Sequence, residues 1–155
     1  ENYFKKEAIA RMNIFIEEFQ KELSARILDL FTMFKNDVIQ LNGRRHKFFS
    51  FNNVQKTEEN VCSAPNILAT SGRSKWLCTI KKDYVTENDI AEIIKDAKHK
   101  KHADRINKNI LISLTGIDEN AYLLAKEAKF WIWDLDSVNI LMELYGKPNI
   151  DTALK

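Results

Sequence analysis

The stretch that decides the fold is PNILATSGRSKWLCTIKK, residues 65–82. It holds the end of one apolar, β-branched run (61–70) and all of a second (75–82), and a polar SGRS segment joins them. Runs of this length around a short glycine-containing turn are typical of paired antiparallel strands. The aromatic run HKFFSFNNVQ (46–55) precedes them across a polar KTEEN segment. The sequence therefore predicts three consecutive antiparallel strands.

After this meander, helical and strand patterns alternate. The segments NILISLT (109–115) and FWIWD (130–134) are short and apolar, which is typical of strands buried on both faces. Capping residues predict the starts of three helices, at Thr86 with Asp89, at Asp118 and at Asp136. Gly146 and Pro148 mark the end of the last helix. The predicted fold class is α/β, with a mixed central β-sheet flanked by helices.

A long amphipathic helix is predicted before the meander. Residues 1–42 contain no glycine or proline, and apolar residues recur every three or four positions, as in Phe4, Ala8, Met12, Phe15 and Phe19. Gly43 is the expected end. We therefore expect two parts: a helix over 1–43, whose C-terminal half packs on the core, and an α/β domain over 44–155. The rest of the helix is expected to be an arm for a homodimer or a partner protein.

The composition is that of an ordinary globular protein, with 45% hydrophobic and 30% charged residues. No stretch has the length of apolar sequence needed to span a bilayer, and no signal-peptide pattern is present, so we expect no membrane partner. Cys62 and Cys78 lie in apolar runs and are expected to be free thiols, which favours a cytoplasmic location. No glycine-rich phosphate loop occurs, so no nucleotide partner is expected.

The net charge of +2 says little about partners, but basic residues cluster in residues 95–108. A cluster of this kind can neutralise phosphates, although a solvated helix face explains it equally simply. The expected nucleic-acid contacts are Lys81, Lys82, Lys95, Lys98, Lys100, Lys101 and Arg105.

The order helix, three-strand meander, helix and buried strand, together with residues 65–82, resembles the PD-(D/E)xK or restriction-endonuclease-like nuclease superfamily, nearest its Mrr-like branch. The resemblance covers about residues 24–147. In that family an Asp on the second strand and Glu-x-Lys or Gln-x-Lys on the third form the catalytic site. The resemblance places these roles on Asn66, Thr79 and Lys81, and only the lysine is retained.

Phosphodiester hydrolysis by this family requires Mg²⁺, which is usually held by one or two carboxylates. An amide and a hydroxyl supply no negative charge, so the resemblance implies a degenerate site and no cofactor. Mg²⁺ is expected only if the chain is active. Carboxylates that could replace the lost ones are Glu58, Glu59, Asp83 and Glu92.

Three functions follow from this sequence. The first is a nuclease-fold domain that binds DNA or supports assembly without cutting, and is therefore not an enzyme. The second is an active metal-dependent endonuclease whose carboxylates have moved. The third is a protein-interaction or dimerisation module of a larger protein, in which the phenylalanine-rich stripe is the functional surface.

Overall fold

A computed structural model describes residues 23–57, 64–72 and 74–151. The N-terminal half of the expected arm, Cys62, Glu58 and Glu59 lie outside these residues. The described part has the order α2, β1, β2, β3, β4, β5, α3, β6, α4, β7, α5. No helix in this part is both long and apolar enough to cross a bilayer.

Helix α2 (Leu23–Thr32) ends earlier than the apolar stripe predicts. The chain turns at Asn36, which has a positive φ, and forms a hairpin of β1 (Asp37–Leu41) and β2 (Arg44–Phe48). Asn42 and Gly43 both have positive φ, as a tight hairpin turn requires. The prediction of helix for residues 33–42 is therefore wrong. Their alternating apolar residues Ile39 and Leu41 are buried from a strand.

The central sheet has five strands in the order β3-β4-β5-β6-β7. Strands β3 (Asn53–Lys56), β4 (Asn66–Ser71) and β5 (Ser74–Lys81) form the predicted antiparallel meander. The predicted first strand, 46–55, is divided: its start belongs to β2 in the separate hairpin, and only its end belongs to β3. Strands β6 (Lys108–Ser113) and β7 (Trp131–Trp133) continue the sheet in parallel with β5. The predicted fold class, α/β with a mixed sheet flanked by helices, is confirmed.

Helix α3 (Glu87–Asp104) begins at the predicted capping box of Thr86 and Asp89. Helix α4 (Glu119–Glu127) begins at Asp118, also as predicted. Helix α5 (Leu135–Leu144) is capped by Asp134, not by Asp136, because strand β7 already ends at Trp133.

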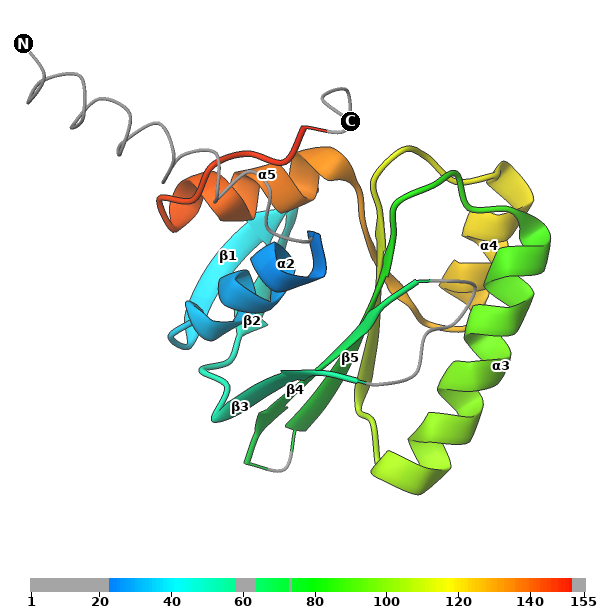
Figure 1. The fold of residues 1–155 in the computed structure, drawn as a ribbon, viewed down its shortest axis with the longest axis horizontal. Coiled ribbons are helices and arrows are strands. Elements are labelled where there is room, and N and C mark those ends of the chain that lie inside the picture. The colour runs from blue at the N-terminus through cyan, green and yellow to red at the C-terminus, as the bar shows by residue number, and fades with distance from the viewer. Residues whose placement is uncertain (1–22, 58–63, 73, 152–155) are drawn as a thin grey trace, which may run out of the picture.

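Two apolar layers enclose the sheet (Figure 1). Helices α2 and α5 and the β1–β2 hairpin cover one face, where Phe31, Phe48 and Trp133 form the centre of the larger cluster. Helices α3 and α4 cover the other face around Ile90 and Leu111. Strand alternation therefore assigns each residue of β4 and β5 to one layer or the other.

Candidate functional site

The three motif positions converge on one face of the sheet. Asn66, the first residue of β4, is the register partner of Thr79 on β5. Facing residues of an antiparallel pair have Cβ atoms about 4.5–5.5 Å apart, so these two side chains are neighbours. Lys81 follows Thr79 by two residues and therefore points to the same face, which α3 covers. The fold thus gathers Asn66, Thr79 and Lys81 at the carboxyl end of β5.

Asn66 is fully buried, with 0% of its surface exposed. Its side-chain Oδ1 and Nδ2 atoms find no hydrogen-bond partner among the described residues. A buried amide that lacks partners costs about 1–3 kcal/mol in desolvation. Sites that keep such a group are often functional, or derive from a functional site. Asn66 is therefore a polar residue that folding stability does not explain.

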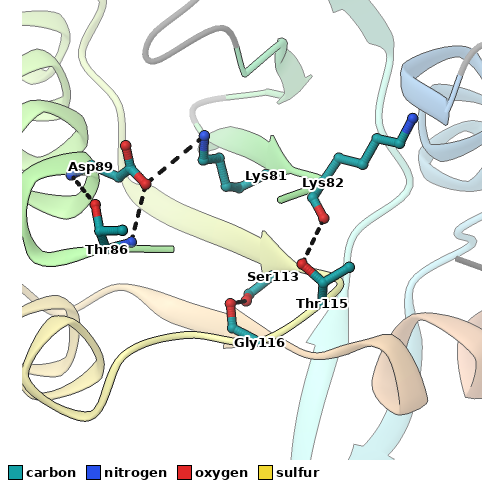
Figure 2. Close-up of polar contacts among 7 residues, drawn as sticks. All are labelled: Lys81, Lys82, Thr86, Asp89, Ser113, Thr115 and Gly116. Carbon is teal, nitrogen blue, oxygen red and sulfur yellow. Dashed lines mark hydrogen bonds and ion pairs between the residues drawn. The ribbon is translucent and has the colours of Figure 1, made fainter. Parts of the chain in front are cut away.

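The Lys81 ammonium lies 3.9 Å from the Asp89 carboxylate, and both side chains are largely buried, with 12% and 23% exposed. The same Asp89 oxygen accepts a hydrogen bond from the Thr86 backbone N–H at 3.0 Å. The Thr86 hydroxyl in turn accepts from the Asp89 N–H at 3.2 Å. Asp89 therefore does two things: it helps to cap α3, and it places one negative charge beside Lys81 (Figure 2).

The segments that follow β5 and β6 hold this arrangement in place. Val85 forms a parallel bridge with Ile117, and the Val85 N–H donates to the Gly116 carbonyl at 3.0 Å. The Ser113 hydroxyl donates to the same carbonyl at 2.9 Å (Figure 2). Gly116 has a φ of 124°, and an added Cβ would lie 3.3 Å from the Tyr84 ring. Only glycine allows this turn to pass so close to Tyr84.

Lys82 does not join Lys81. Figure 2 shows the two lysine side chains pointing in opposite directions, as expected for neighbours at the end of a strand. The Lys82 carbonyl accepts a hydrogen bond from the Thr115 hydroxyl at 2.9 Å, which fixes its backbone. Its side chain is exposed, while that of Lys81 is largely buried.

The expected basic contacts spread along α3. Lys95, Lys98, Lys101 and Arg105 are exposed, whereas Lys100 is buried and its ammonium lies 2.9 Å from the Asp96 carboxylate. At about 1.5 Å per residue, Lys101 lies roughly 18 Å further along the helix than Asp89. After α3 the chain returns to the start of β5, where the Asn107 N–H donates to the Lys75 carbonyl. The far end of α3 is thus at the opposite end of the sheet from Lys81.

The candidate replacement carboxylates do not assemble a metal site within the described residues. Asp83 is exposed in the bend after β5, and Glu92 is exposed one turn after Asp89. No group of three His, Cys, Asp or Glu side chains in that part of the chain could hold a metal ion. Asn66, Thr79 and the single carboxylate of Asp89 offer one charged ligand, which is a poor match to a Mg²⁺ site made by protein side chains.

Sequence reasoning missed Asp89 as a site residue because it interpreted this residue only as a cap. The spacing along the chain could have indicated this role. Only five residues separate the end of β5 from the start of α3, so Asp89 in the first turn of α3 must lie near the end of β5. The capping box that fixes the start of α3 therefore also positions the carboxylate next to Lys81.

Comparisons with known proteins do not identify a family. No family model matches the chain, and no curated protein sequence matches it. Among solved structures, the chain is similar to one described as "Structure of EndoMS in apo form", with a TM-score of 0.49, 10% identity, and coverage of 74% of this chain and 44% of that chain. A second is "Crystal Structure of Protein of Unknown Function AF1548", with a TM-score of 0.45, 15% identity, and coverage of 83% and 66%. The chain thus spans less than two thirds of either protein.

Proposed function

We propose that this chain is a restriction-endonuclease-like domain with a degenerate PD-(D/E)xK site, and that it binds duplex DNA without cutting it. The supporting observation is the register of β4 and β5, which pairs Asn66 with Thr79 beside Lys81. These positions adjoin in space as the family's Asp, Glu and Lys do, and two of them carry neutral side chains. The Mrr-like branch, to which residues 65–82 are most similar, is part of this proposal.

The neutral side chains of Asn66 and Thr79 are the reason why we propose DNA binding without cleavage. A divalent metal ion must polarise the phosphate and activate a water molecule. With neutral residues at both carboxylate positions, the site can attract a phosphate through Lys81 but holds no ligand set for the metal. The exposed lysines in the first half of the basic segment, Lys95 and Lys98, extend the positive surface along α3, and the exposed Lys82 adds a charge that points away from Lys81 (Figure 2).

Fluorescence anisotropy with a labelled duplex at two salt concentrations tests this function. The samples contain Mg²⁺ or Mn²⁺, and the same samples are run on a denaturing gel. We expect binding that weakens steeply with salt, intact DNA, and weaker binding by Lys81→Ala. Lys35→Ala is the matched control, because Lys35 is exposed and follows α2 on the other side of the sheet. Absence of binding at low salt, or equal losses in the two variants, contradicts the proposal.

A second candidate function is metal-dependent cleavage with a relocated carboxylate, and the contact between Asp89 and Lys81 is the observation that favours it. A metal ion could use Asp89 together with the phosphate of the substrate. This candidate predicts cleavage by the wild-type chain in Mn²⁺ or Mg²⁺ that disappears in Asp89→Asn. Intact DNA under all metal conditions rules it out.

A further inference from the structure

A cavity of about 660 Å³ lies at the carboxyl ends of β6 and β7, and Asn66, Thr79 and Lys81 are not among the residues that line it. In open α/β sheets this end of the strands is where ligands commonly bind. The volume is in the range of pockets that take a small organic molecule and is too large for an inorganic ion alone. The residues that give it chemical character are Arg44, His46, Tyr122, Lys126, Trp131 and Asp136.

The positive charges of the cavity come from both layers of the fold. Arg44 is on the β1–β2 hairpin, which covers one face of the sheet, and Lys126 is on α4, which covers the other. Neither side chain forms an ion pair with any described residue. Asp134 and Asp136 also line the cavity, so its charges are mixed. The two cations, which form no ion pair with a described residue, can hold an anionic group of the ligand.

The aromatic wall is neutral. The His46 ring lies 4.1 Å from the Trp131 ring. Burial lowers the pKa of His46, and the charges of Lys108 and Arg44 lower it further, so the imidazole is uncharged at neutral pH. Tyr122 adds a third ring at the cavity, one turn before Lys126 on the same face of α4, and the Lys126 ammonium lies 5.8 Å from the centroid of that ring. A flat, weakly polar group fits such a wall better than a sugar or an alkyl chain.

Besides its positive charges and aromatic rings, the cavity has a carboxylate that can accept a hydrogen bond from a ligand. Asp134 already caps α5 by accepting from the Ser137 N–H. The Asp136 side chain makes no hydrogen bond or ion pair with the described residues and lines the same cavity. A free carboxylate beside an aromatic wall suits a ring that carries N–H donors.

We propose that this cavity binds a single nucleotide unit, with its phosphate on Arg44 and Lys126, its base against His46 and Tyr122, and a base N–H on Asp136. The unit can be a free mononucleotide or one nucleotide of a single strand, and only the second source rests on the proposed function. Ser113 lines the cavity and is the register partner of Lys81, so the two sites adjoin. This site was not predicted from the sequence, because side chains from separate elements, not a glycine-rich loop, would hold the phosphate.

Isothermal titration of the full chain tests the proposal with the four deoxynucleoside monophosphates, inorganic phosphate and a short oligodeoxythymidylate. We expect binding of a mononucleotide or of the oligonucleotide, with the dissociation constant raised about tenfold or more by Arg44→Ala and by Lys126→Ala. Arg45→Ala is the matched control, because Arg45 is the next residue on the exposed strand end but points to the opposite side of the hairpin. The Asp136→Asn variant should change the ranking of the four mononucleotides.

Three results overturn the proposal: no binding of any nucleotide probe, an equal loss in Arg45→Ala, or inorganic phosphate that competes as well as a mononucleotide does. Binding of the oligonucleotide without the mononucleotides assigns the site to a strand, and the converse assigns it to a free nucleotide. The duplex titration with Lys81→Ala is scored separately. If Lys81→Ala does not weaken duplex binding, the nucleotide titration of Arg44→Ala still stands. If Arg44→Ala does not weaken nucleotide binding, the duplex titration still stands.

Discussion

Replacing Asn66 by leucine should stabilise the domain. Asn66 is completely buried, and both polar atoms of its side chain lack partners among the described residues. Leucine has the same number of side-chain heavy atoms and the same branch point, so Asn66→Leu removes the polarity and keeps the shape. The desolvation penalty of an unpaired amide is about 1–3 kcal/mol, and most of it should return as folding free energy.

Urea unfolding followed by tryptophan fluorescence measures this change, because a shift in the midpoint at constant slope reports stability. For a chain of this size each kcal/mol corresponds to about 2–4 °C in the melting temperature. The matched control is Asn139→Leu. The Asn139 side chain donates to the Ile150 carbonyl at 3.0 Å and accepts from the Ile150 N–H at 2.7 Å. Here the same substitution breaks two hydrogen bonds and should destabilise by about 1–3 kcal/mol.

Opposite signs for the two substitutions support the argument. If Asn66→Leu destabilises as much as Asn139→Leu does, the Asn66 amide has a partner, and the reasoning that it is an orphaned group is refuted. A functional readout completes the test: because Asn66 is fully buried and cannot contact DNA directly, duplex binding should change less in Asn66→Leu than in Lys81→Ala.

Three further predictions concern other contacts. Thr86→Ala removes the acceptor for the Asp89 N–H, so it should lower the unfolding free energy by about 1 kcal/mol, and an unchanged urea midpoint would argue against the cap. Asp89→Asn removes the negative charge beside Lys81, so duplex should bind a few-fold more tightly in anisotropy titrations, and weaker binding would contradict this. Because the pKa of His46 is lowered in the folded state, the unfolded state binds the proton more readily, and stability should fall as the pH drops through about 6.5. His46→Leu should reduce that fall in thermal melts at several pH values. The same pH dependence in the wild type and the variant would exclude His46 as its cause.

Local patterns in the sequence were sufficient for most of the fold. The two apolar runs around residues 71–74 specify β4 and β5, since a glycine-containing turn leaves an antiparallel pair as the simplest arrangement. The capping residues Thr86 and Asp118 define where α3 and α4 begin, because a helix start needs an acceptor for its unpaired N–H groups. Continuous apolar runs likewise identified β6 and β7 as strands, although β7 lies at the edge of the sheet and only Trp133 of it is buried.

The β1–β2 hairpin was not predicted, because apolar residues spaced by two and by four overlap in a short segment. Val38 and Leu41 fit the helical period, whereas Ile39 and Leu41 fit the strand period, which leaves Val38 65% exposed. The hairpin turn at Asn42 and Gly43 and the contacts of Phe48 with Trp131 and Trp133 favour the strand conformation. These rings come from residues more than eighty positions apart, so tertiary packing decides between the two periods.

The sequence alone determined which residue types stand at the motif positions, and therefore that Asn66 and Thr79 carry neutral side chains. Only the tertiary structure decided what surrounds them. The pairing of Asn66 with Thr79 depends on the register of β4 and β5, and register is known only once the strands are paired in the structure. The ion pair of Lys81 with Asp89, and the cavity between Arg44 and Lys126, join residues from separate elements. No spacing along the chain encodes such contacts, because they depend on how the sheet, the hairpin and the helices pack together.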